Sequence, residues 1–513
     1  IEKEMTSDLI KYSKDLKPQE LQKQLEKLGG LKALRGFANE LRLVRDNGKL
    51  GKLLEISRKS GARKFADMYM ELRYDMILSA PTTQGAAFMG NALMSMYSLS
   101  NQAIGGLLAG DGGKTTMQAV RTAKNLLMAT PDAYRAAKIA AKNSQGQMAL
   151  NSHYEKVGGK AFSMEETGFK GAFGESVENM GEMLSFGPKG LVFQDEFYRH
   201  MFAKAQTKAL LTGEYNELVK RGEAPLEKLD EYIEGKMSRY FVDGKRFRTK
   251  NDVNLEAVSK AREQNLEGDE AVDFVQKYMK DNWSEKLSSE MEYMKDFGDR
   301  ITFQQELSKD YGFFERMGSR VQDERLQNYI VQYLVPFIKT PVNIFKEFGG
   351  TTSQFAQIPG IGKLWARSRE ELMSDNPMVR AQARGRQIVG MGLWGSALTL
   401  AHQQIITGSG PNDYKELQNK KNSGWIPNAI NTSALKRFHE TGDSGGDKPG
   451  DKYVSLQRAD PLATITGFAA DLMRAREDND FSDEDFTYLI QTTVFALKRA
   501  VAQKSYLETV GSA

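Results

Sequence analysis

The sequence predicts an all-α fold, an elongated multi-helix architecture with long loops. Residues that lose little rotamer freedom in a helix, namely Ala, Leu, Met, Lys, Glu and Gln, are abundant, and strand-rich stretches are hard to find. The 513 residues include only 13 prolines. Apolar residues recur at helical spacing, as Leu21, Leu25 and Leu28 do before Gly29-Gly30 ends the run.

The composition excludes several classes of site. The chain has no cysteine, so it forms no disulfide and no thiolate metal site. Its histidines, His153, His200, His402 and His439, lie far apart without an i, i+4 pair, and we expect neither a metal ion nor another cofactor. The 71 basic residues nearly balance the 67 acidic ones, unlike the clustered basic excess of a DNA-wrapping protein. Because the sequence begins at Ile1 without an initiator Met, we expect it to be part of a longer polypeptide.

Changes in charge and glycine content divide the chain into five segments. Residues 1–75 form a charged helical segment, and residues 76–190 combine Met-rich apolar helices of small residues with Gly-rich loops. Charged amphipathic helices return over 191–335. An apolar helix and a region of Gly/Asn-rich loops fill 336–475, before an acidic patch and a C-terminal helix at 476–513.

Glycine positions predict where helices are interrupted. The glycine density of residues 111–190 predicts loops and shorter helices there. Gly213 is expected to stop the helix that contains Phe197 and Met201. Residues 409–451, with Gly445-Gly446 among several Asp residues, are expected to be a flexible loop region.

The chain contains two runs without any Asp, Glu, Lys or Arg, residues 76–110 and 387–412. We call them the charge-free runs. In the first, small residues four apart allow close backbone approach and Met supplies adaptable packing. The second has an apolar centre of 14 residues, 388–401, too short for a straight membrane crossing. The candidate membrane or subunit contacts are Ala86, Gly90, Met94, Gly390, Leu393 and Trp394. A buried helical hairpin in a soluble oligomer and a helix pair that later meets lipid both remain open for the first run. The second run could form a core helix, an interfacial helix or one arm of an oligomeric pore.

Nucleotide-binding and hydrolase signatures are incomplete. Gly113-Lys114-Thr115 suggests a phosphate-binding loop, but Leu108 occupies the position of its first glycine and no strand precedes it. The spaced glycines Gly168, Gly171 and Gly174 lack a βαβ frame. No Gly-x-Ser-x-Gly elbow supports serine catalysis.

Five short blocks recur in one order and resemble the large helical regions of bacteriophage internal virion proteins and the related polyvalent phage proteins. The resemblance covers about residues 70–475. The blocks are Leu78-Ser79-Ala80-Pro81-Thr82 with Asn91; Asp195-Glu196-Phe197; Phe337-Ile338-Lys339-Thr340-Pro341-Val342-Asn343-Ile344; Thr407-Gly408-Ser409-Gly410-Pro411 leading into Gly424-Trp425-Ile426-Pro427-Asn428; and Val454-Ser455-Leu456 with Arg458-Ala459-Asp460-Pro461. The resemblance implies that Pro341 begins a helix, that Asn343 lies one turn into it, and that Asp460-Pro461 starts another helix.

The resemblance implies an internal virion protein of a short-tailed phage that acts in DNA ejection. Copies would assemble as a ring or tube on the portal inside the capsid, beside other internal virion proteins. After ejection they would line a conduit through the host cell envelope, touching its membrane and, transiently, the phage DNA. The alternative is a purely structural scaffold associated with the portal that never meets a membrane.

A peptidoglycan-degrading virion protein is the enzymatic alternative that the resemblance raises. Some ejection proteins carry a lytic transglycosylase whose acid belongs to a Glu-Ser pair, and this chain has Glu175-Ser176. The segment that follows, Val177-Glu178-Asn179-Met180, does not match that family. Trp425 beside Pro427 could stack on a base, but a structural corner is the interpretation we favour. We therefore expect no catalytic residue and no enzymatic activity.

Overall fold

The structure of the chain is a computed structural model in which helices dominate. It describes residues 61–143, 161–244, 246–307, 339–351, 366–411, 413–456 and 462–477, with a few single positions between them. Within these ranges the strands are two short antiparallel pairs, which confirms the all-α class. The helices expected in residues 1–60 and the C-terminal helix expected after the acidic patch lie outside the described residues.

Contacts divide the chain into two units. One comprises residues 1–69 with 165–168, and its described part consists of the start of α5 (Gly61–Ser79) and most of α8 (Met164–Thr167). The other comprises residues 70–164 and 169–513, and every contact discussed below lies within it.

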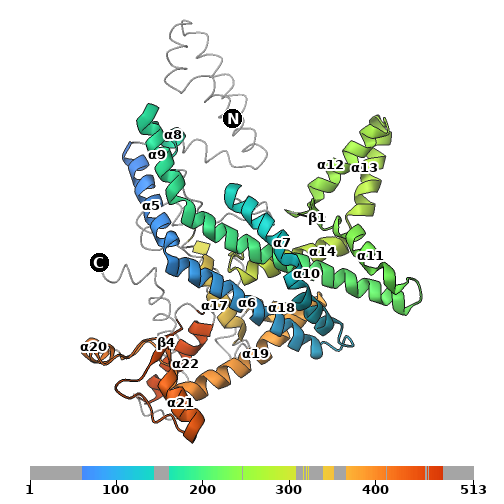
Figure 1. Cartoon of the computed structure of the whole chain (residues 1–513). Helices are drawn as coiled ribbons and strands as arrows, with labels where there is room; N and C mark the ends of the chain where they lie inside the picture. The colour runs from blue at the N-terminus through green and yellow to red at the C-terminus, as the bar shows by residue number, and fades with distance from the viewer. Residues whose placement is uncertain are drawn as a thin grey trace. The chain divides into compact units, whose positions relative to one another are not determined.

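Three long helices of the second unit pack together: α6 (Pro81–Leu107), α7 (Lys114–Asn143) and α10 (Phe186–Lys220). Figure 1 shows α10 crossing the centre of the molecule, with α9 (Gly171–Leu184) leading into it. Pro81 is at the start of α6, where its missing N–H costs no intrahelical hydrogen bond. These helices carry many of the large apolar side chains that are exposed to solvent.

Two predicted interruptions are wrong. Residues 111–190 contain the 30-residue helix α7 rather than only shorter helices, and α10 runs through Gly213 to Lys220. One helical glycine costs only about 1 kcal/mol relative to alanine, and packing along a long helix offsets that amount. The side chain of Asp111 caps α7, accepting the backbone N–H groups of Gly113 (3.0 Å) and Thr115 (2.9 Å).

The middle of the chain forms the charged helices that the sequence predicts. Two of them, α12 and α13, form the helical pair that projects in Figure 1. A capping box joins Thr249 and Asp252 at the start of α12, and Ser284 caps α14. The elements are η1 (Leu226–Lys228), α11 (Leu229–Met237), β1 (Phe241–Val242), β2 (Arg246–Phe247), α12 (Lys250–Glu263), α13 (Gly268–Asn282) and α14 (Glu285–Ile301).

The second charge-free run lies mostly in α19 (Pro377–His402), which packs against α6, α17, α18 and α22. Helix α17 (Lys339–Thr351) contains Pro341 in its first turn. Helix α18 (Ala366–Met373) precedes α19, and α22 (Leu462–Glu477) begins directly after Asp460-Pro461. The two helix starts implied by the resemblance are therefore present.

The expected loop region 409–451 contains regular elements between its loops. It contains α20 (Tyr414–Asn422), β3 (Ala429–Asn431) and α21 (Thr432–Thr441), and β3 pairs with β4 (Tyr453–Ser455). The Asp residues that suggested flexibility take part in ion pairs and hydrogen bonds. The guanidinium of Arg437 holds Asp451 at 2.8 and 2.9 Å, so this segment is tied down.

Helices α6 and α19 cross with their backbones almost touching. A Cβ atom built on Gly105 would lie 1.7 Å from the carbonyl oxygen of Ala381. One built on Gly385 would lie 1.7 Å from the carbonyl oxygen of Asn101. The two glycines therefore permit the crossing, and no side chain fits there without moving a helix.

We expect Gly385→Ala to lower the free energy of unfolding by about 1–3 kcal/mol or more, because the added methyl group meets backbone. Gly392→Ala, in the same helix but with nothing within 4 Å of its Cβ position, is the matched control. It should be neutral or stabilise by up to about 1 kcal/mol. Urea denaturation of both variants measures the difference, and equal stabilities would contradict the crossing.

Candidate functional site

Polar residues of three motif blocks lie at buried junctions between helices. Asn91 of α6 donates a hydrogen bond to the carboxylate of Asp195 in α10 (3.1 Å). Asn343 of α17 donates to the backbone carbonyls of Phe303 and Gln305, both at 2.9 Å. These side chains satisfy polar groups inside the helical core, which explains why amide and carboxylate residues stand there.

The fourth block forms a corner held by its own hydrogen bonds. Thr407 donates its hydroxyl to the carbonyl of Ile426 (2.7 Å), and the Ser409 N–H donates to the carboxylate of Asp471 (2.6 Å). Trp425 is buried, so it is no exposed platform for base stacking. The structure thus agrees with the interpretation of this segment as a structural corner.

Four charged side chains, Arg300, Glu347, Glu371 and Arg386, form what we call the buried charge cluster. They come from α14, α17, α18 and α19, and each is less than 10% exposed or at that limit. Arg300 lies 2.8 Å from Glu371 and 3.3 Å from Glu347, and Arg386 pairs with the same two carboxylates. Tyr97 of α6 lies beside them; burial, with the charge of Glu347, raises the pKa of its hydroxyl far above the usual value.

More polar groups fill the interior around this cluster. Arg199 is 2% exposed and forms an ion pair with Asp299 at 2.8 Å. Gln102 and Gln206 are fully buried, and within the described part of the chain their amides have no hydrogen-bond partner. Buried polar groups without full pairing make a core costly to keep closed. The interior therefore combines hydrophobic clusters with buried ion pairs and amides.

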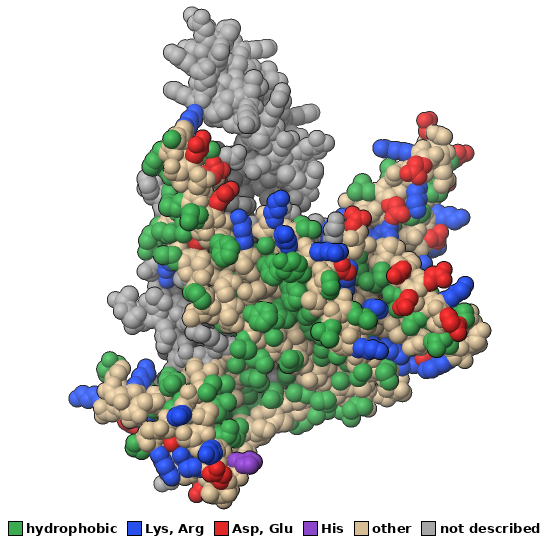
Figure 2. Space-filling view, in the orientation of Figure 1, with side chains coloured by type: hydrophobic (Ala, Val, Ile, Leu, Met, Phe, Trp, Pro, Cys, Tyr) green, Lys and Arg blue, Asp and Glu red, His purple; other side chains and the backbone are tan. Residues whose placement is uncertain are grey.

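Large apolar side chains point outward instead, over α6, α7, α9 and the start of α10. Figure 2 shows hydrophobic side chains spread over α6, α7 and α10, whereas charged ones gather on α11 to α13 and on α20 and α21. The exposed residues that define this apolar surface are Phe88, Met89, Met96, Leu107, Met117, Val120, Leu127, Met128, Tyr134, Phe173, Met180, Met183 and Phe186. Their exposed fractions reach 84% at Leu127. Large apolar side chains exposed in this number are typical of a surface that contacts another molecule.

The candidate contacts of the first charge-free run mostly face inward. Met94 is completely buried against Tyr198 and Phe297, and Gly90 is buried as well. Ala86 is partly exposed. In the single chain Gly90 and Met94 lie in the core, where Met94 packs against α10 and α14, and their contact with a neighbour stays a prediction. The opposite face of α6 carries Phe88 and Met96 and belongs to the apolar surface.

The second charge-free run shows the same arrangement. Gly390 and Trp394 are buried, and Trp394 packs edge-on against Phe468 of α22 at 5.5 Å between ring centroids. Leu393 is partly buried in the same cluster. The outward face of α19 carries small residues that the sequence analysis missed, although their helical spacing was visible: Gly392, Gly395, Ser396 and Thr399.

The remaining chemical candidates do not assemble into a catalytic site. Glu175 is exposed on α9, whereas a glycosidase acid needs an apolar cleft that keeps it protonated. The carboxylate of Asp111 occupies the amide groups at the start of α7 that a phosphate would need. In the described ranges no group of His, Asp and Glu residues is arranged to hold a metal ion.

No family model matches the chain, and no curated protein or solved structure shows significant similarity to it. None of the helices that the structure describes is long and apolar enough to cross a membrane. The function is therefore inferred from the motif blocks and the geometry above.

We expect Arg300→Met to lower the free energy of unfolding by about 3–5 kcal/mol, because it leaves two buried carboxylates with one arginine. The control is Lys436→Met, which removes an ion pair with Glu440 whose side chains are 77% and 56% exposed. That change should cost less than about 1 kcal/mol. Chemical denaturation measures both, and a loss as small in Arg300→Met as in the control would refute the role of the buried charge cluster.

The stability of the protein should depend on the ionisation of Asp195. Burial raises the pKa of this carboxyl group to about 6, against the opposing effects of Arg199 and of the amides of Asn91 and Gln304. Between about pH 4, the value of an unfolded Asp, and pH 6, only the folded protein keeps the proton. The free energy of unfolding therefore falls as the pH rises through this window and stays lowered above it.

Asp195→Asn removes this contribution. We therefore expect the free energy of unfolding of the variant, relative to that of the parent protein, to rise by up to roughly 3 kcal/mol between pH 4 and pH 7.5. Urea denaturation at several pH values measures the shift. The carboxyl group of Asp75, whose pKa burial raises to about 7, titrates in both proteins and cancels in the difference. A difference independent of pH would show that Asp195 is ionised throughout.

Proposed function

We propose that the chain is a structural ejection protein of a phage virion, which assembles with copies of itself inside the capsid and later helps to form the conduit for genome delivery through the host envelope. The observation that carries this proposal is the large number of exposed apolar side chains on α6, α7 and α9, which stand outside an interior that already has its own hydrophobic clusters. The motif blocks that resemble internal virion proteins support it.

The exposed apolar surface favours an assembling protein over a freestanding enzyme. Outward residues such as Leu127 and Phe186 lose contact with water only when another surface covers them. The open faces of α6, α7 and α9 offer that surface to copies of the chain or to lipid. Each long helix satisfies its own backbone hydrogen bonds, so such helices can move against neighbours without exposing unpaired backbone groups.

A portal-associated scaffold that stays in the capsid is the second candidate. The burial of Gly90, Met94, Gly390 and Trp394 favours it, because the charge-free runs then serve packing within the chain. The exposed apolar surface fits both candidates. A cell-wall hydrolase fits less well, since exposed Glu175 lacks an apolar cleft.

Self-association through the outward face of α19 tests the proposal. Gly395 has nothing within 4 Å of its Cβ position, so Gly395→Leu fits the single chain and adds helix propensity. A leucine there would block close approach by a second helix. We expect sedimentation velocity to show an oligomer for the parent protein and a strong shift toward monomer for Gly395→Leu.

The matched control is Gly235→Leu, an equally open helical glycine on α11. It should leave the oligomer intact. A compact monomer at all concentrations, with and without detergent, would overturn assembly. Virions carrying Gly395→Leu that package the protein but fail to deliver DNA would favour the conduit, whereas normal delivery would favour the scaffold.

A further inference from the structure

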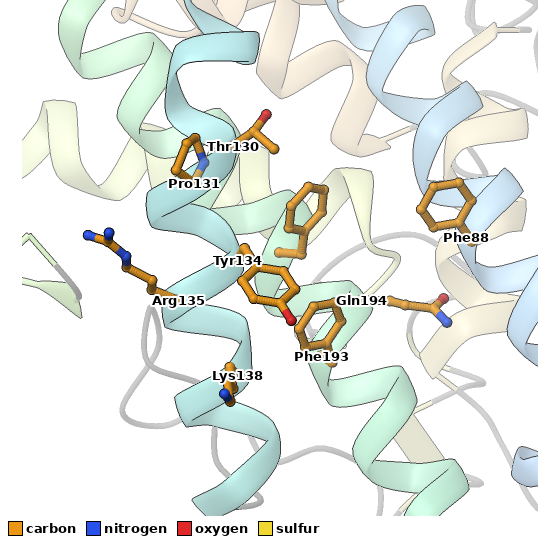
Figure 3. Close-up of a pocket in the computed structure, with 9 residues that line it drawn as sticks. Phe88, Thr130, Pro131, Tyr134, Arg135, Lys138, Phe193 and Gln194 are labelled. Atoms are coloured by element: carbon orange, nitrogen blue, oxygen red, sulfur yellow. The ribbon is translucent and has the colours of Figure 1, made fainter.

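A pocket of about 740 Å³ opens in the apolar surface where α6, α7 and α10 face one another. Figure 3 shows Tyr134 of α7 facing Phe193 of α10, with Phe88 of α6 across from them. The lining residues are Phe88, Thr130, Pro131, Tyr134, Arg135, Lys138, Phe193, Gln194 and Phe197. Its volume is in the range of small-ligand sites.

The wall of the pocket is aromatic. Tyr134 and Phe193 meet edge-to-face at 5.6 Å, and Phe193 stacks on Phe197 at 6.3 Å. The Thr130 hydroxyl donates to a backbone carbonyl, and the Gln194 NH2 group donates to Gln84 at 2.8 Å, whereas the Gln194 side-chain oxygen is buried without a hydrogen-bond partner among the described residues. The aromatic wall therefore suits a mainly apolar group.

The rim of the pocket is basic. Arg135 is 78% exposed at its side chain, and Lys138 is exposed one turn further along α7. Helix α7 contains six basic residues and one acidic residue, a net charge of +5. That acid, Asp132, lies 2.6 Å from Lys204 and 3.9 Å from Arg135, so it is largely neutralised by Lys204. The rim is left with an excess of positive charge.

We propose that this pocket binds an anionic phospholipid of a membrane surface, with an acyl chain against Tyr134, Phe193 and Phe88 and the phosphate at Arg135 and Lys138. An aromatic pocket beneath a basic rim complements a ligand with an apolar tail and a negative head. The inference rests on the proposed function, in which the chain meets the host envelope, and it assigns that contact to one place.

Lipid fits this surface better than single-stranded nucleic acid does. Bases stack on aromatic rings, but the exposed side chains that continue along α7 are aliphatic: Met117, Val120, Leu127 and Met128. Aliphatic side chains beside lysines are typical of a helix that lies in a bilayer interface. A membrane would cover these residues and the pocket together.

Flotation of the full chain with vesicles tests the proposal. We expect binding to vesicles of phosphatidylcholine with phosphatidylglycerol and little binding to phosphatidylcholine alone. Arg135→Glu with Lys138→Glu should weaken the binding roughly tenfold or more. Lys415→Glu with Lys421→Glu, an equal charge change on exposed positions of α20, should have a much smaller effect.

The pocket is tested apart from the surface charge. Lysophosphatidylglycerol below its critical micelle concentration should bind the parent chain. The double variant Phe88→Ser with Tyr134→Ser should not bind it. Both side chains are more than half exposed, so the variant should keep its fold. Equal binding to neutral and anionic vesicles, or binding that survives the pocket changes, would overturn the proposal. So would a single-stranded oligonucleotide that binds the parent chain and is released by the same changes.

The two proposals fail separately. A chain that forms oligomers but ignores anionic lipid would leave the ejection function standing and refute the pocket. A chain that binds anionic lipid through the pocket but never self-associates would refute assembly and leave the pocket standing.

Discussion

The arrangement of the second unit depends on four buried charges that neutralise one another. Arg300, Glu347, Glu371 and Arg386 come from four helices spread over almost ninety residues of sequence, and their charges sum to zero. Removing any of them from water is costly unless the other three are in place. The cluster therefore requires that α14, α17, α18 and α19 come together. The Gly105–Gly385 crossing then brings α6, with Tyr97, against the same group.

Helix α6 carries large apolar side chains on its outward face as well as in the core. Helix α6 has no charged residue, yet it directs Asn91 and Asn101 inward and Phe88 and Met96 outward. An amphipathic helix of a soluble monomer shows the reverse. Asn91 donates a hydrogen bond to Asp195 inside the core, whereas the buried amide of Gln102 on the same helix has no hydrogen-bond partner among the described residues. The outward apolar side chains of such a helix leave water only when another molecule covers them, and only then do they add to stability.

The sequence allowed the helices to be predicted but not their junctions. The charge-free runs were expected to be helical from their composition, and both lie in helices. Gly213 was misjudged because packing offsets the small cost of one helical glycine. Arg300 and Glu371 could not be recognised as buried, since a charged residue in a helical pattern usually lies on a solvated face, and their pairing joins residues 71 positions apart. Asn91 and Asp195 were singled out as motif residues, but only the structure shows that they touch.

The burial of the charge-free runs changes how membrane contact is best understood. If Met94 and Trp394 were to meet lipid, the chain would have to open its core and expose the buried charge cluster, at a cost of several kcal/mol for each unpaired ion. The apolar surface requires no such opening, because Leu127, Phe88 and Tyr134 already face outward. A basic helix, α7, borders that surface and supplies attraction to negative headgroups. Contact with an envelope therefore needs only that lipid replace copies of the chain on the apolar surface. The buried charge cluster stays buried in this exchange.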